Sequence, residues 1–241
     1  GSTVRGGLGK SGGMVLGGTD EAINISNDSI LTGGSIKGGS VSGGGRGMSI
    51  NESSVTGGIT NSIGGRISGG STSAIGISNS TIEGGIRNSG TIKSAGGGSS
   101  AAIALWTGAI VNSGVTNTGL IDAGTLGAAG ILLGSATLNG GIVNGGTITS
   151  THTGIYIKSN STLTGGITNA GLIQAVGDAA SAAIKIEASS VAGSIVNSGT
   201  IRLQTTESSQ AALYLSQATL AGGITNSGTI SASGQEGTYG I

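Results

Sequence analysis

The stretch from Gly154 to Ile173, GIYIKSNSTLTGGITNAGLI, contains the pattern from which most of the chain is built. It has two apolar residues separated by one other, Ile155 and Ile157, and then an Ile that opens a Gly-Gly-Ile-x-Asn element. Both features recur, with substitutions, from about residue 22 to residue 241. A fixed period of this kind predicts a solenoid or a propeller. The residues that open the second element are 25 to 29 positions apart: Ile59, Ile86, Val115, Ile142, Ile167, Ile195 and Ile224.

The short apolar runs favour strands over helices. They alternate with polar residues and lack the i, i+3, i+4 spacing of a helix face. Clusters of Gly, Ser and Asn between them predict frequent corners. A propeller blade needs about 40 residues and a leucine-rich repeat has its own Leu spacing, and neither pattern is present. We therefore predict an all-β, single-stranded parallel β-helix (β-solenoid) with about 8 coils of roughly 27 residues each.

Each coil is expected to place about five apolar residues inside. In the clearest coil these are Ile155, Ile157, Leu163, Ile167 and Ile173. Equivalent residues of successive coils would stack at strand spacing, about 4.8 Å apart. Because a single coil buries too little apolar surface to offset its conformational entropy, its stability depends on its neighbours.

One Asn recurs at the same place in every fully formed coil. Asn tolerates turn conformations, and stacked amides can hydrogen-bond along the axis as a ladder, so we interpret these residues as structural. In six of the seven coils a Gly follows this Asn two positions later, and it is expected to need a positive φ. The predicted ladder consists of Asn61, Asn88, Asn117, Asn144, Asn169, Asn197 and Asn226, and the glycines are Gly90, Gly119, Gly146, Gly171, Gly199 and Gly228.

Composition excludes several classes of partner. Ten basic and ten acidic residues leave no net charge, which argues against nucleic-acid binding. Without Cys there is no disulfide and no thiolate metal site, and no apolar run reaches the ~18 residues of a membrane span. We treat 1–241 as a single β-helix domain, with 1–21 as an irregular N-terminal coil or frayed end and 22–241 as the repeat coils. The opening Gly1-Ser2 and the end in mid-repeat suggest a fragment of a longer protein.

The unit Gly-Gly-Ile-Thr-Asn-Ser-Gly-Thr-Ile at 222–230, nearly repeated at 84–92, closely resembles the passenger domains of bacterial autotransporters (type V secretion). The resemblance implies a right-handed parallel β-helix, exported through the outer membrane to the cell surface, with a C-terminal membrane barrel outside this sequence. It also implies a role as a stalk or in adhesion, self-association, biofilm formation or virulence. The partners would be a host or surface glycan or protein, or identical copies. Large non-autotransporter adhesins have similar repeats, and the repeat carries no catalytic motif.

We predict that the chain is not an enzyme and has no metal or cofactor. The single His152 lies in a loop, and Glu187 has Lys158 and Ser216 in the adjacent coils, which is no acidic cluster for calcium. A glycan-processing β-helix of the lyase or tailspike kind is the first alternative. An ice-binding solenoid is another, but it requires outward Thr in register, and two Leu interrupt the column Thr91, Leu120, Thr147, Leu172, Thr200 and Thr229.

One surface is a candidate binding site. The residue between each pair of apolar residues should point outward, which gives the column Asn24, Ser49, Gly76, Ala104, Leu132, Tyr156, Lys185 and Tyr214. Trp106 flanks this column, so three of the four aromatic residues lie on one sheet. We hypothesise a stacking platform for a glycan or a partner protein, formed by Trp106, Leu132, Tyr156, Lys185 and Tyr214. The alternative is that these rings pack against neighbouring strands beneath a loop.

Overall fold

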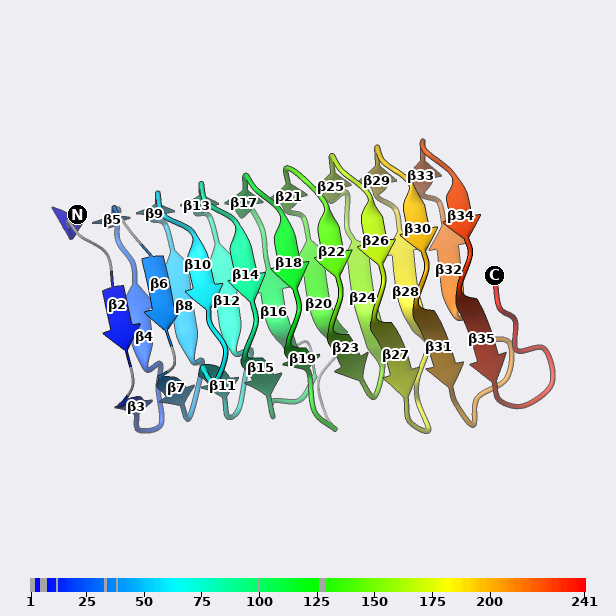
Figure 1. Cartoon of the computed structure of the whole chain (residues 1–241), viewed down its shortest axis with the longest axis horizontal. Coiled ribbons are helices and arrows are strands. Elements are labelled where there is room, and N and C mark those ends of the chain that lie inside the picture. Colours follow the sequence, from blue (N-terminus) through cyan, green and yellow to red (C-terminus); the bar gives the residue numbers. More distant parts are fainter. Residues whose placement is uncertain are drawn as a thin grey trace.

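The computed structural model describes residues 3–4, 8–11, 13–32, 34–37, 39–98, 100–125 and 129–241. In these ranges the regular structure consists of β-strands without helices, and every strand pair is parallel. The predicted all-β solenoid of about 8 coils is therefore confirmed. Its strands stack along the long axis, and the two ends of the chain lie at opposite ends of the stack (Figure 1).

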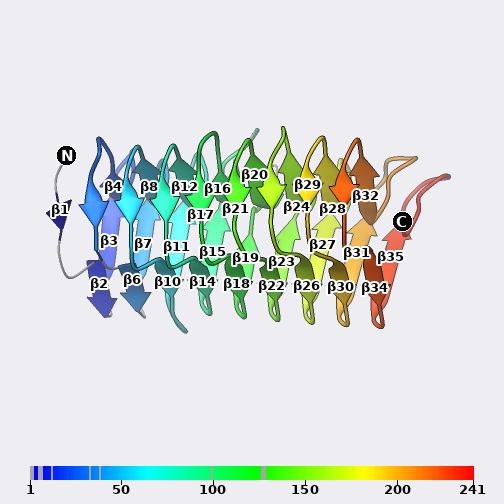
Figure 2. The same cartoon turned by 90° about the horizontal axis from the view of Figure 1, so that it is seen from above.

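Each regular coil adds one strand to each of four sheets, in the same order (Figure 2). The β1–β33 sheet contains β1 (Thr3–Val4), β5 (Ile30–Leu31), β9 (Ser54–Val55), β13 (Thr81–Ile82), β17 (Ile110–Val111), β21 (Thr137–Leu138), β25 (Thr162–Leu163), β29 (Ser190–Val191) and β33 (Thr219–Leu220). The β2–β34 sheet contains β2 (Leu8–Ser11), β6 (Gly34–Lys37), β10 (Ile59–Asn61), β14 (Ile86–Asn88), β18 (Val115–Asn117), β22 (Ile142–Asn144), β26 (Ile167–Asn169), β30 (Ile195–Asn197) and β34 (Ile224–Asn226).

The other two sheets have longer strands. The β3–β35 sheet contains β3 (Met14–Gly17), β7 (Ser40–Gly43), β11 (Arg66–Gly69), β15 (Thr91–Ser94), β19 (Leu120–Asp122), β23 (Thr147–Ser150), β27 (Leu172–Val176), β31 (Thr200–Gln204) and β35 (Thr229–Ser233). The β4–β32 sheet contains β4 (Ile23–Ile25), β8 (Met48–Asn51), β12 (Ile75–Ser78), β16 (Ala101–Leu105), β20 (Ala129–Gly134), β24 (Thr153–Lys158), β28 (Ala182–Glu187) and β32 (Leu213–Ser216).

The core lies inside the tube formed by these sheets. The five apolar residues expected inside the clearest coil are all fully buried, and each pairs in register with an aliphatic residue of the next coil. Ile155, for example, lies between Ile131 and Ile184. Aliphatic side chains stacked in this way fill the interior, and the ladders satisfy the backbone amides and carbonyls between coils.

The N-terminal segment 1–21 is described only in part. Strands β1, β2 and β3 each pair with the equivalent strand of the following coil. Positions 1–2, 5–7 and 12, and residue 33 of the first repeat coil, lie outside the described residues.

The corner between the β4–β32 and β1–β33 sheets is built from left-handed residues. Their amides reach the next coil, as in the hydrogen bonds from Asn79 N to Thr107 O (2.9 Å) and from Ala188 N to Ser216 O (3.0 Å). Beside them, Ser side chains accept from the preceding coil, with Ser161 N donating to Ser189 Oγ at 3.1 Å. Hydrogen bonds of the backbone and of Ser side chains therefore also join successive coils at this corner. Its residues with positive φ are Asn27, Asp28, Glu52, Asn79, Gly108, Ser135, Ser159, Asn160, Ala188 and Gln217.

Candidate functional site

The expected outward column lies on the outer face of the β4–β32 sheet. The register pairs Leu132 with Tyr156, Tyr156 with Lys185, and Lys185 with Tyr214. Since alternate residues of a strand share a face, Lys158 and Glu187 lie on this same outer face, two positions after Tyr156 and Lys185. Two neighbouring columns of side chains thus run along the sheet.

Trp106 joins these columns because a glycine leaves room for its ring. Gly134 lies one coil further on, and a Cβ at that position would be 3.1 Å from Trp106 Cε3. The ring also approaches the Lys158 side chain, whose Nζ is 6.0 Å from the ring centroid. Since Gly134 pairs with Lys158 in the sheet, the indole bridges three coils.

Each of the two lysines lies between two aromatic rings. Lys158 Nζ is 5.1 Å from the centroid of Tyr156, in addition to its contact with Trp106. Lys185 Nζ is 5.2 Å from the Tyr156 ring and 5.4 Å from the Tyr214 ring. Cations at these distances are attracted to the ring faces, which holds the lysines in place. We call this group the aromatic–lysine strip: Trp106, Tyr156, Lys158, Lys185, Glu187 and Tyr214.

Glu187 fixes the middle of the strip. Its Oε1 is 3.1 Å from Lys185 Nζ, and its Oε2 accepts a hydrogen bond from the Tyr156 hydroxyl. Burial, then the hydrogen bond to Glu187 and its negative charge, raise the pKa of Tyr156. Burial alone would raise the pKa of Glu187, but the hydrogen bonds from Tyr156 and Lys185 and the charges of Lys185 and Lys158 outweigh it and lower that pKa. The carboxylate is therefore ionised and the phenol neutral at physiological pH.

Leu132 requires a correction. It points to the outer face as expected, but it is 0% exposed and cannot itself contact a partner. It belongs to a small apolar cluster with Ala101, Ala104 and Ala129, against which Trp106 and Tyr156 pack. The rings of Trp106 and Tyr156 therefore cover this cluster with part of their surface, whereas Tyr214 is 37% exposed.

The structure brings the five proposed binding residues together, and four of them, Trp106, Tyr156, Lys185 and Tyr214, reach the surface. The sequence predicted that Lys158 and Glu187 lie in adjacent coils, but this served only as an argument against a calcium site. It gave Gly134 no role. The alternation of faces along β24 and β28 could have predicted the second outward column, which contains Lys158 and Glu187. The position of the indole over Gly134 could not be predicted in this way, because it depends on a side-chain rotamer.

The Asn residues form a continuous ladder on the β2–β34 sheet, buried from Asn61 to Asn197. In each of these six, the amide Nδ2 donates to the Oδ1 of the Asn in the next coil at 2.7 to 2.8 Å, and to two backbone carbonyls. For Asn169 these carbonyls belong to Gly171 (3.2 Å) and Thr200 (3.0 Å). The ladder begins at Asn61, whose Oδ1 has no hydrogen-bond partner among the described residues, because the register places Ile36 at the equivalent position one coil earlier. The last member, Asn226, is exposed, accepts from Asn197 and donates to the carbonyl of Gly228 at 3.1 Å. Between these two ends, the amides hydrogen-bond to one another and to the backbone, which supports the structural interpretation of the ladder.

The expectation of a positive φ at the glycines that follow the Asn residues was wrong. None of the six is among the described residues with positive φ. They are required for a different reason: a Cβ on Gly171 would be 2.1 Å from the carbonyl oxygen of Gly146 in the preceding coil. The same clash, at 2.1 to 2.2 Å, occurs at the other five. Close approach between coils, and not backbone conformation, selects glycine here.

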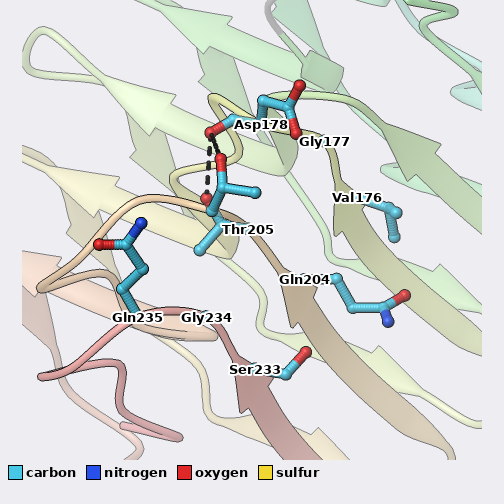
Figure 3. A pocket seen from close by; sticks show the side chains of 9 residues that line it. Val176, Gly177, Asp178, Gln204, Thr205, Ser233, Gly234 and Gln235 are labelled. Carbon is cyan, nitrogen blue, oxygen red and sulfur yellow. Dashed lines mark hydrogen bonds between the residues drawn. The ribbon is translucent and has the colours of Figure 1, made fainter.

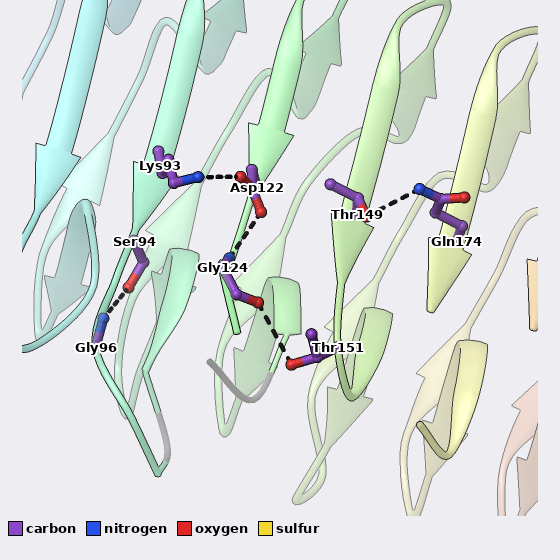
Figure 4. Close-up of polar contacts among 8 residues, drawn as sticks. All are labelled: Lys93, Ser94, Gly96, Asp122, Gly124, Thr149, Thr151 and Gln174. Atoms are coloured by element: carbon purple, nitrogen blue, oxygen red, sulfur yellow. Dashed lines mark hydrogen bonds and ion pairs between the residues drawn. The ribbon is translucent and has the colours of Figure 1, made fainter. Parts of the chain in front are cut away.

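The outer face of the β3–β35 sheet carries polar pairs (Figure 4). Lys93 Nζ is 2.7 Å from Asp122 Oδ2, and Gln174 Nε2 donates to Thr149 Oγ1 at 3.1 Å. Arg202 in turn donates to Gln174 Oε1. These groups satisfy one another across neighbouring coils.

A shallow groove lies at the edge where the same sheet ends near the C-terminus (Figure 3). It has a volume of about 480 Å³ and is lined by backbone and by Asp178, Gln204, Thr205 and Gln235, among others. Thr205 and Thr206 both donate hydrogen bonds to the carbonyl of Asp178, which ties two loops together. The lining contains no aromatic ring and no cation.

Within the described ranges, no group of three or more His, Cys, Asp or Glu is placed to hold a metal ion. No helix of sufficient length and hydrophobicity to span a membrane occurs there either. The acids that an enzymatic β-helix would need are dispersed, and Glu187 is engaged with Tyr156 and Lys185. Comparisons with protein families, curated proteins and solved structures found no match for this chain.

Proposed function

We propose that this chain is a non-catalytic region of an exported bacterial surface protein, of the kind found in autotransporter passenger domains. It would lie outside the cell and serve in adhesion or self-association, through a glycan, a protein or identical copies. The resemblance of the repeat to those passengers supports the export route. The adhesive role is supported by the aromatic–lysine strip, which is the observation that carries the proposal.

The strip differs from the rest of the surface in what it exposes. It gathers three of the four aromatic residues of the chain on one face, and its lysines lie over the rings. Partly exposed aromatic side chains combine a large apolar area with few rotatable bonds, which makes them efficient contact residues. By comparison, the β2–β34 sheet presents isolated aliphatic side chains such as Val143 and Val196.

The test is a triple substitution, Trp106→Ser, Tyr156→Ser and Tyr214→Ser, in the protein displayed on bacterial cells. We expect adhesion to surfaces and cell aggregation to fall to the level of cells without the protein. The matched control is Val143→Ser with Val196→Ser, which removes exposed apolar groups from the β2–β34 sheet and should leave both assays unchanged. Circular dichroism of each purified variant checks that the solenoid is intact.

Because Trp106 and Tyr156 also cover the buried cluster, the triple variant could lose stability. The single variant Tyr214→Ser avoids this, since Tyr214 does not pack on the cluster. We expect it to reduce adhesion several-fold. Unchanged adhesion and aggregation in both the triple and the single variant would rule out the proposed role of the strip.

A further inference from the structure

We infer that the aromatic–lysine strip binds an acidic polysaccharide, laid along the solenoid axis with a carboxylate-bearing sugar over its Trp106–Lys158 half. This inference rests on the proposed adhesive function and names the class of partner. It depends on three properties of the strip: its unbalanced charge, its alternation of rings with polar groups, and its direction.

The unbalanced charge lies at Lys158. The strip has two lysines and one carboxylate, and Glu187 pairs with Lys185 at 3.1 Å. Within the described part of the chain, no carboxylate lies within ion-pairing distance of Lys158, which contacts the rings of Trp106 and Tyr156 and interacts with Glu187 only at longer range. Rings attract a cation without pairing it with a negative charge, so Lys158 is the lysine of the strip that is left to form an ion pair with an anionic ligand.

The two halves of the strip suit different groups of a sugar. Lys158 offers hydrogen-bond donors for a carboxylate, whereas the ionised Glu187 repels anions and accepts hydrogen bonds from hydroxyl groups. Beside them the Tyr214 ring, which is 37% exposed, offers apolar surface, and sugar rings likewise have C–H faces between their polar edges. A protein loop could use the same charges, but it would not need aromatic rings and polar groups that alternate along the axis.

The direction of the strip favours an extended polymer. Its members come from the turn after β16 and from β24, β28 and β32, which follow one another along the axis, with β20 between the first two. Adjacent coils are about 4.8 Å apart. The side chains are also held before binding, since each lysine contacts two rings and Tyr156 is hydrogen-bonded to Glu187. Little side-chain entropy would then be lost when a ligand binds.

The chain provides its own probe, because Trp106 is its single tryptophan. The experiment is a titration of the whole chain with oligogalacturonate, followed by the fluorescence emission of Trp106. The comparison compounds are cellohexaose as a neutral sugar, a heparin oligosaccharide as a sulfated sugar and sodium sulfate as a simple anion. We expect a saturable change with oligogalacturonate, no change with cellohexaose or sulfate, and weaker binding as salt is added. A stronger response to heparin than to oligogalacturonate would show that the strip prefers a sulfated sugar, and the carboxylate-bearing ligand inferred here would be wrong.

Lys158→Gln should weaken oligogalacturonate binding at least about tenfold, as expected when a hydrogen bond to a charged group is lost. The matched control is Arg87→Gln, which removes one positive charge from the exposed face of β14 and should leave the affinity unchanged. If both variants weakened oligogalacturonate binding equally, the affinity would depend only on the net charge of the chain, and the inference would be wrong.

The outcomes separate this inference from the proposed function. If no glycan changes Trp106 emission while the triple variant loses adhesion, the adhesive function stands and the acidic glycan is wrong. If emission instead changes with protein concentration alone and the chain dimerises, the partner is a second copy. If oligogalacturonate binds and Lys158→Gln abolishes binding while adhesion is unaffected, the site is correct and the adhesive function is wrong.

Discussion

Gly145 and Gly146 are adjacent in sequence, but only one of them has room for a side chain. A Cβ on Gly146 would be 2.2 Å from the carbonyl oxygen of Gly119, whereas a Cβ on Gly145 meets nothing closer than Asn117 O at 3.9 Å. Glycine is therefore required only at those positions where the backbone of one coil lies directly against the backbone of the next.

We expect Gly146→Ala to destabilise the fold by about 1–3 kcal/mol, because the coils must separate to admit the methyl group. Gly145→Ala should be neutral or slightly stabilising, since it restricts the unfolded chain without a clash. Urea denaturation of the two variants measures the difference. Equal stabilities would mean that the close contact between coils at Gly146 relaxes without cost.

Glu187 gives the strip a dependence on pH. Its pKa is lowered by Tyr156 and the lysines despite its burial, so the folded state favours the ionised form. A carboxylate with a lowered pKa stabilises the fold above its unfolded pKa, near 4.3, and this stabilisation disappears as the pH falls through the lower, folded value.

We therefore expect Glu187→Gln to be less stable than the parent at pH 7, by less than about 1 kcal/mol because the pair is partly exposed. The difference should shrink as the pH is lowered below about 4.3. Denaturation midpoints at both pH values test this, with Glu207→Gln, on an exposed loop, as the control. A difference that stays constant with pH would mean that Glu187 acts through packing and not through its charge.

At the scale of elements, the strands of the β2–β34 sheet are joined by the Asn ladder as well as by backbone hydrogen bonds. Asn169 illustrates the arrangement: it is 0% exposed, accepts from Asn144 at 2.7 Å and donates to Asn197 at 2.7 Å. Its loss would leave polar groups unsatisfied in both adjacent coils, which costs more than the hydrogen bonds contribute.

Asn169→Ala should lower the free energy of unfolding by about 2 kcal/mol or more. Asn139→Ala is the matched control, since Asn139 Nδ2 also donates to an Asn of the preceding coil, Asn112, at 2.8 Å, but in a partly exposed corner. Its cost should stay below about 1 kcal/mol. Chemical denaturation of both variants measures the contrast, and similar losses would show that burial of the ladder is unimportant.

At the scale of the whole molecule, stability is distributed along the tube. Its coils repeat the same aliphatic columns, and the described residues hold no group of His, Cys, Asp or Glu suited to a metal. The fold should therefore need no ion, unlike an enzymatic β-helix whose acids gather around calcium.

We expect calcium or EDTA to change the melting temperature of the chain by less than about 1 °C, because a metal ion stabilises a fold only when it binds the native state selectively, and the described residues offer no cluster of ligands for it. Differential scanning calorimetry with each additive measures this. A clear increase in melting temperature with calcium would favour the alternative of a glycan-processing β-helix.

The sequence alone determined the architecture of this protein. The period of about 27 residues, the alternation of apolar residues and the recurring Asn predict parallel coils, because each coil must bury its side chains against its neighbours. Even the outward column that pairs Tyr156 with Lys185 follows from that register. Such features repeat, and repetition is readable without coordinates.

Only the tertiary structure decided the features that do not repeat. The indole of Trp106 lies over Gly134, Leu132 is buried beneath the rings, and Lys158 lies between Trp106 and Tyr156. These depend on rotamers and on packing across three coils, which a one-dimensional pattern does not encode. The glycine at 146 is selected in the same way, by a carbonyl 27 residues away in sequence, at Gly119, and one coil away in space.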